Sequence, residues 1–441
     1  MNAMLDCVVS AAISWALLRF VVLPPVLRWT LCVLGTLAVW SASWTVATLW
    51  DLAPWAVDTA LLLVAIASKA LASSRNAKRE PQDSDRVEKL AFFAICVIAT
   101  SALIEHLMRY PDGGNDAFII WNLRARWLFR AADQFKTAFS PEILFWAHPD
   151  YPLLLPALVV RGFTAIGRET AAVPGVVAVL FAACSVAVVV GGAPHRRRWL
   201  AGLAMVTTPA LVMLAATEQA DVPLAAFLGA SVAVLIVRQP GDLRALVAAG
   251  AFASMAAWTK NEGSLHFLLI AAAVVLQERR LKPLLAFVAG ALPFLALLIA
   301  FKLSYAPAND LLGMTVASAL PRALSPERWW TLLTLSLRRL ILLQVWGLHL
   351  VALLVFLIIG RRYSRMPPHL TFLSYVPAAA MFVHAAILLG QPHDLTFMFK
   401  VTIDRLLIEL WPAIILLVFA RISSPSELVA SSHQHGYWTK L

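Results

Sequence analysis

The chain has 441 residues, of which 61% are hydrophobic and only 14% are charged. An ordinary soluble domain is about half apolar and a quarter charged, so this composition rules out a soluble domain and indicates a polytopic membrane protein. The net charge of +11 does not indicate a nucleic-acid partner, because the basic residues fall in short clusters between apolar segments, as in the cytoplasmic loops of membrane proteins.

Apolar runs of about 20 residues, the length that a helix needs to cross the hydrocarbon core, recur along the whole chain. They predict an all-α transmembrane bundle of about 13 spans. The runs 4 to 23, 29 to 49 and 54 to 72 precede the most charged loop of the chain, which spans 73 to 89. Positively charged loops face the cytoplasm, so we expect residues 1 to 89 to form three helices and a cytoplasmic loop.

The span 90 to 109 leads outward from this loop, which places the polar and aromatic stretch 110 to 151 on the periplasmic face. Residues 116 to 132 put Ile120 and Trp127 on one helical face with arginines around them, the pattern of a helix lying along the headgroups. Such a helix is either a simple anchor or a support for carboxylate and guanidinium groups just above the bilayer. Guanidinium forks suit the recognition of phosphate.

Two later apolar runs differ from simple crossings. The run 151 to 167 begins Tyr-Pro and carries Arg161, and a full crossing there would place the cluster Arg196 to Arg198 on the outer face. We interpret this run as re-entrant or interfacial; the alternative is a break in the positive-inside rule. The run 329 to 346 contains two consecutive arginines, which favours an amphipathic helix in the interface.

On this topology, the outer ends of the spans gather ionisable residues, which are costly near a membrane and are functional candidates there. Each one alone is more often a solvated loop residue or a helix-end charge that reaches water. Their convergence at one face is what indicates a site. The residues are Asp112, Asp116, His148, Asp150, Glu218, Asp221, Lys260, Glu262, Asp310, His393, Asp394 and Arg405.

Short motifs recur in order among these residues. Asn115-Asp116-Ala117 lies early in the outer loop, and the string from His148 to Leu153 opens the next apolar run with two prolines. Asp221-Val222-Pro223, Thr259-Lys260-Asn261-Glu262-Gly263 and a leucine-rich string from Arg405 to Pro412 follow. Together they resemble motifs of the GT-C superfamily of integral-membrane glycosyltransferases, in particular the branch with protein O-mannosyltransferases and lipid A aminoarabinose transferases.

The resemblance covers roughly residues 90 to 280 and the last span. It implies a GT-C-like membrane catalytic region over 90 to 422, with 1 to 89 as an N-terminal addition. Residues 423 to 441 are polar, rich in serine and without periodicity, so we expect a flexible cytoplasmic tail there. The chain departs from the family pattern after Asp116, where the family often has a second acidic residue, and between its paired prolines.

GT-C enzymes transfer a sugar from a polyprenyl-phosphate donor to a hydroxyl on the outer face, with inversion at the anomeric carbon. This chemistry needs a carboxylate that accepts the proton of the acceptor hydroxyl and cations that neutralise the departing phosphate. The resemblance implies Asp116 as the base, and Asp112 is the second candidate because a turn-like Pro-Asp-Gly-Gly sequence surrounds it.

For the donor phosphate, the expected ligands are Lys260 and Arg405, with Arg124 and His148 nearby. A second set is expected to bind substrate: Asp150, Glu218, Asp221 and Glu262. Asp221 and Glu218 could instead orient the lysine or ligate a divalent cation, which some GT-C enzymes require and others do not. No cofactor is certain, and the metal question stays open at this point.

Three function classes are compatible with the sequence. The first is a glycosyltransferase of the bacterial inner membrane with a periplasmic active site, whose partners would be a polyprenyl-phosphate sugar, a lipid or glycan acceptor and membrane lipids. The second is a transporter or flippase for a lipid-linked saccharide, which would need charges along a path through the bilayer. The third is a GT-C-shaped protein without catalysis.

Overall fold

The computed structural model describes residues 3–53, 86–140, 147–308, 315–341, 349–360 and 367–422, with a few residues between these ranges. Most of the predicted helix 54 to 72, most of the charged loop 73 to 89, Asp310 and the tail 423 to 441 lie outside the described residues.

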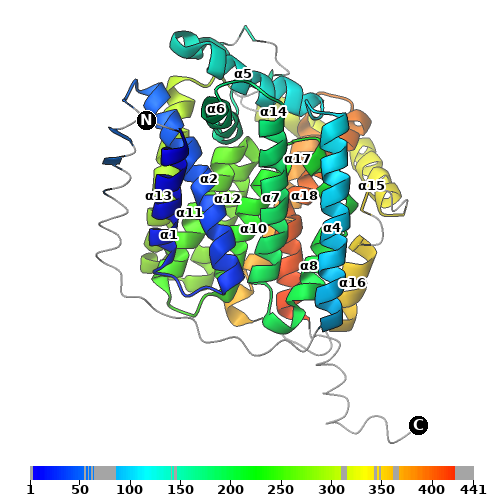
Figure 1. The fold of residues 1–441 in the computed structure, drawn as a ribbon. Helices are drawn as coiled ribbons and strands as arrows, with labels where there is room; N and C mark the ends of the chain where they lie inside the picture. Colours follow the sequence, from blue (N-terminus) through cyan, green and yellow to red (C-terminus); the bar gives the residue numbers. More distant parts are fainter. Residues whose placement is uncertain are drawn as a thin grey trace, which may run out of the picture.

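Every regular element in the described part of the chain is helical, as predicted, and most of the helices run side by side in one bundle (Figure 1). A π-helical turn over Ala117–Asn122 leads into α5, which lies across one end of the bundle. The α-helices are α1 (Ala3–Leu18), α2 (Pro25–Leu49), α4 (Arg86–Arg109), α5 (Leu123–Arg130), α6 (Leu154–Ile166), α7 (Ala172–Gly192), α8 (Arg198–Val206), α9 (Pro209–Ala216), α10 (Asp221–Val237), α11 (Leu243–Thr259), α12 (Asn261–Glu278), α13 (Leu281–Ser304), α14 (Val316–Ala323), α15 (Pro326–Ile341), α16 (His349–Gly360), α17 (Val376–Gly390) and α18 (Leu395–Arg421).

Five of the helical segments described are long and apolar enough to cross a membrane, or six if α8 and α9, bent by 55°, count as one broken span. The five are α2, α4, α7, α13 and the segment ending in α17. Helix α4 also exposes a row of large apolar side chains, among them Phe93, Val97 and Ile98, as a lipid-facing helix does. The chain is therefore a helical protein suited to a membrane, while the count of about 13 spans stays a prediction.

Helix α10 forms the centre of the bundle. Every residue from Asp221 to Leu235 is buried, and α10 packs against α7, α11 and α18. A helix that is apolar on all sides belongs inside a bundle or a membrane, and α10 has 17 residues with a single charged side chain. That side chain, Asp221, lies in the first turn, so the fold places a carboxylate at one end of its most buried helix.

Helices α11 and α13 pack backbone against backbone. A Cβ atom added at Gly250 would lie 1.9 Å from the carbonyl oxygen of Phe287, and one added at Gly290 would lie 1.9 Å from the carbonyl oxygen of Val247. Only glycine permits this approach, which small residues provide in membrane helix pairs generally. Helix α11 ends at Thr259, and Lys260 follows it directly as the residue between α11 and α12.

The apolar runs 151 to 167 and 329 to 346 form helices that are too short for ordinary crossings. Helix α6 has 13 residues, below the roughly 20 that a crossing needs. Its Arg161 is buried and binds Asp6 of α1 at 2.5 Å and Ser43 of α2 at 2.8 Å. Helix α15 has 16 residues, and its Arg339 forms an ion pair with Asp404 of α18. The placement of both runs relative to a membrane stays a prediction.

The N-terminal helices belong to the same hydrophobic core as the rest of the bundle. Helix α2 packs against α6 and α7, and the hydroxyl of Ser41 donates to the carbonyl of Leu154 at 3.0 Å. Buried leucines of α2, including Leu27 and Leu31, contribute to the main core. The predicted boundary at residue 89 therefore separates two parts of the sequence but not two cores.

Candidate functional site

The π-helical turn and α5 hold the outer-loop carboxylate against the end of the bundle. Ala117, Ile120 and Trp121 are buried, whereas Phe118 is exposed, so this segment is amphipathic as the sequence predicts. Asp116 immediately precedes the turn. The buried face therefore fixes the backbone that carries the expected base.

Asp116 is linked to the interior of the bundle by one arginine. Nη1 of Arg405 donates to Oδ2 of Asp116 at 2.6 Å, and Nε of the same guanidinium donates to Oδ2 of Asp221 at 3.1 Å. Asp221 accepts a second bond on Oδ1 from Nζ of Lys260, at 2.8 Å. The structure thus brings together four residues that the sequence places in four separate motifs.

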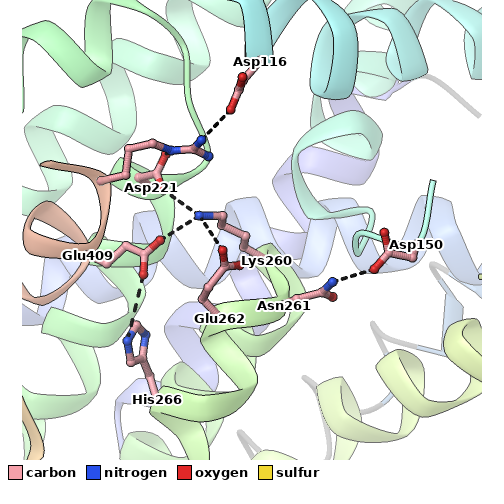
Figure 2. Close-up of polar contacts among 9 residues, drawn as sticks. Asp116, Asp150, Asp221, Lys260, Asn261, Glu262, His266 and Glu409 are labelled. Atoms are coloured by element: carbon pink, nitrogen blue, oxygen red, sulfur yellow. Dashed lines mark hydrogen bonds and ion pairs between the residues drawn. The ribbon is translucent and has the colours of Figure 1, made fainter. Parts of the chain in front are cut away.

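Lys260 lies at the break between α11 and α12, where its extended backbone interrupts the two helices. Its side chain is 2% exposed, and Nζ lies 2.8 Å from Asp221, 3.0 Å from Glu262 and 2.9 Å from Glu409. Figure 2 shows the three carboxylates pointing at the ammonium group. A buried charge is tolerated only when it is paired, and this one has three partners.

Glu409 is a member of the site that the motif comparison missed. It is fully buried in α18 and follows Arg405 by four residues, so the two side chains lie on the same helical face. The signal in the sequence is a lone acidic residue inside the last apolar run, which is a functional candidate by position alone.

We call these linked groups the ion cluster. In it, four carboxylates face two cations, which leaves an excess of two formal negative charges. Its members are Asp116, Asp221, Glu262, Glu409, Lys260 and Arg405.

A second polar group adjoins the ion cluster at the start of α12. Nδ2 of Asn261 donates to Oδ2 of Asp150 at 2.6 Å, and Nζ of Lys302 donates to Oδ1 of Asn261 at 2.8 Å. Because Asn261 follows Lys260 directly, the N-terminus of α12 joins both groups (Figure 2). Asp150 was expected from the sequence, whereas Lys302, in the last turn of α13, was not singled out.

Arg124 and His148 meet at the 147–151 turn and are not members of the ion cluster. The Arg124 guanidinium is buried and donates to the backbone carbonyls of Ala147 (2.8 Å), Tyr151 (3.0 Å) and His148. The His148 ring stacks on Tyr151, which stacks in turn on Trp121. The structure therefore uses Arg124 to fix the 147–151 turn and does not place its guanidinium in the ion cluster.

The remaining predicted residues, Asp112 and Glu218, lie in a neighbouring group. Asp112 is exposed and forms an ion pair with Arg126 at 2.6 Å. Glu218 has a left-handed backbone (φ 54°) in the turn before α10 and accepts a hydrogen bond from Nδ2 of Asn122 at 2.7 Å. Of the two candidate bases, Asp116 is the one that the structure joins to Lys260 and Arg405.

Glu218 should make stability depend on pH. Burial raises the pKa of its carboxyl to about 7 from 4.5, against the opposing effect of the Asn122 hydrogen bond. Between these values the folded chain holds a proton that the unfolded chain has released, so stability falls as pH rises through this window. The full shift corresponds to roughly 3 kcal/mol. Glu218→Gln, which cannot ionise, should remove this slope.

The measurement is thermal unfolding of the detergent-solubilised protein at about pH 5 and about pH 8. Wild type and the exposed control Glu142→Gln should both lose stability at the higher pH, whereas Glu218→Gln should lose less. Equal losses in all three proteins would show that Glu218 does not titrate in this range.

The chain matches no protein-family model, and it matches neither a curated protein nor a solved structure. The GT-C resemblance therefore rests on the sequence motifs. What the structure adds is the position of their residues, which is set by the contacts of α10, α12, α18 and the outer loop.

Proposed function

We propose that the protein is a membrane glycosyltransferase that moves a sugar from a polyprenyl-phosphate donor to an acceptor hydroxyl at the end of the bundle covered by α5. The observation that carries this proposal is the Arg405 guanidinium, which bridges Asp116 of the outer loop and Asp221 of α10. It provides a cation and a carboxylate side by side, as glycosyl transfer from a phosphate requires.

The Arg405 side chain is 19% exposed and that of Asp116 is 33% exposed, so both can be reached from outside the bundle. A donor phosphate that binds Arg405 competes with Asp116 for the same guanidinium. Asp221, which is fully buried, keeps its bond to Nε and holds the fork in place. Binding of the donor would thereby release the Asp116 carboxylate at the moment when a base is needed.

The transfer step is an in-line displacement. The acceptor hydroxyl gives its proton to Asp116, and its oxygen forms a bond to the anomeric carbon as the bond from that carbon to the phosphate oxygen breaks. The electron pair stays on the phosphate, whose growing charge is stabilised by Arg405 and, from behind, by the charge of Lys260. Lys260 is 2% exposed, so its role is to hold Asp221 and to add positive charge to the electrostatic field at the site.

We place this reaction on the periplasmic face of a bacterial inner membrane, within a GT-C-like bundle of about 13 spans. The α5 segment then lies along the outer headgroups, where the phosphate of a polyprenyl carrier and a lipid or glycan acceptor would both be reached. The identity of the sugar is left to experiment.

The test is transfer of radiolabelled sugar from a panel of polyprenyl-phosphate sugars in proteoliposomes. We expect label to move in wild type, and Asp116→Asn to lower the rate by roughly 10² to 10⁴, the usual contribution of a general base. The pair of Arg130 and Glu169 supplies the control, because Glu169→Gln changes a partly exposed carboxylate that pairs with α5 and lies outside the ion cluster. This control should transfer at the wild-type rate.

Other outcomes would contradict the proposal. Donor that crosses the bilayer unconverted indicates a transporter or flippase, and donor that neither crosses nor reacts indicates a protein without catalysis. If Asp112→Asn rather than Asp116→Asn abolishes transfer, the base is the carboxylate that pairs with Arg126.

A further inference from the structure

Three side chains that the transfer reaction does not use as base or donor ligand meet inside the bundle. One of them, Glu409, belongs to the ion cluster, and the other two are histidines beside it. His266 comes from α12, His384 from α17 and Glu409 from α18. Their nearest nitrogen and oxygen atoms all lie within 4.8 Å of one another, and Nε2 of His266 is 4.0 Å from Oε2 of Glu409. Figure 2 shows His266 directed at the far oxygen of Glu409, away from Lys260.

The polar atoms at this meeting point lack partners among the described residues. Both ring nitrogens of His266, Nε2 of His384 and Oε2 of Glu409 are buried and accept or donate no hydrogen bond there. His266 and Glu409 are fully buried, and His384 is 5% exposed. Buried polar atoms are nearly always satisfied, and an orphaned set that converges on one point indicates something that binds between them.

We propose that His266, His384 and Glu409 bind a Zn²⁺ ion. Two imidazole nitrogens and one carboxylate oxygen are a zinc ligand set that leaves a fourth position open. At zinc–ligand distances of about 2.0 Å, tetrahedral ligand atoms lie about 3.3 Å apart. In the structure the three ligand atoms lie within 4.8 Å of one another. Rotation of the three side chains would bring these atoms to the closer tetrahedral spacing.

The charge of the ion cluster favours a divalent cation at this point. Oε1 of Glu409 binds Lys260 at 2.9 Å, whereas Oε2 faces the histidines, so one carboxylate belongs to both groups. The cluster carries two more negative than positive formal charges, and one Zn²⁺ would balance them. The ion would also tie α12, α17 and α18 together behind the site.

This inference stands independently of the proposed function, because its test measures metal and not transfer. The full-length protein is purified in detergent, stripped with a chelator, dialysed against Zn²⁺ and analysed for metal content. We expect one zinc per chain in wild type and a loss of at least about tenfold in His266→Asn and His384→Asn. His393→Ala, which removes a histidine at an exposed position, should keep the full content.

A gain of signal guards against variants that lose zinc because they misfold. The His384→Cys variant, loaded with Co²⁺, should show a thiolate-to-cobalt charge-transfer band that Co²⁺-loaded wild type lacks, since only direct coordination produces it. Absence of zinc from wild type would overturn the site. So would full zinc content in both His→Asn variants, the result expected if the tail histidines His433 and His435 held the metal, or a cysteine variant that binds Co²⁺ without the band.

Discussion

Replacing Lys260 with methionine should lower the free energy of unfolding by roughly 3 to 5 kcal/mol, the usual effect of removing one partner from a buried ion pair. The ammonium group lies within 3.0 Å of three carboxylates, two of which are fully buried. Methionine keeps most of the unbranched side chain but leaves those charges without their central cation. The measurement is chemical or thermal unfolding of the purified protein in detergent.

Two further variants test the cause of this loss. The exposed Lys136→Met should leave stability unchanged, which controls for the loss of a lysine. The double variant Lys260→Met with Glu409→Gln should be more stable than Lys260→Met alone, because it removes one of the stranded charges. A Lys260→Met protein as stable as wild type would show that the ammonium is not the centre of this network.

A loss of similar size is expected for Asp6→Ala. The Asp6 and Arg161 side chains are 2% and 6% exposed, and Arg161 also donates to the Ser43 hydroxyl. Removing the carboxylate breaks this buried ion pair and leaves the guanidinium inside the bundle, at a cost of roughly 3 to 5 kcal/mol. Unfolding followed by loss of helical signal reports the change.

The double variant Asp6→Leu with Arg161→Met supplies the decisive comparison. A buried pair replaced by apolar residues of similar size is often as stable as the original, so this protein should recover most of the stability that Asp6→Ala loses. The surface pair of Arg130 and Glu169, whose side chains are 70% and 21% exposed, is the comparison, since Glu169→Gln should lower the melting temperature much less than Asp6→Ala. A double variant no better than Asp6→Ala would place the loss in packing.

The sequence predicts the residues of the site better than their partners. Asp116, Asp221, Lys260 and Arg405 were each singled out from short motifs, and the structure joins them in one chain of contacts. Glu409 was not predicted as a partner of Lys260, because 149 residues separate the two in the sequence. No local pattern encodes such a pairing; only the packing of α10, α12 and α18 brings the residues together.

The number of crossings was harder to predict, because an apolar run is not the same as a span. The apolar run 199 to 216 is long enough for one helical crossing, but the structure divides it into α8 and α9 with a bend of 55°. Pro209 begins α9, and the residue before a proline is kept out of the helical region. The hydropathy of the run does not reveal this break, because Thr207 and Thr208 are only mildly polar.

The bond between Asp116 and Arg405 joins residues 289 positions apart. During synthesis from the N-terminus, the outer loop and α10 are made long before α18. The pair formed by Asp221 and Lys260, only 39 residues apart, can form early, whereas Asp116 cannot pair with Arg405 until α18 has been made. A chain that stalls before α18 would therefore lack Arg405 and Glu409, so the ion cluster is completed only when that helix packs against α10.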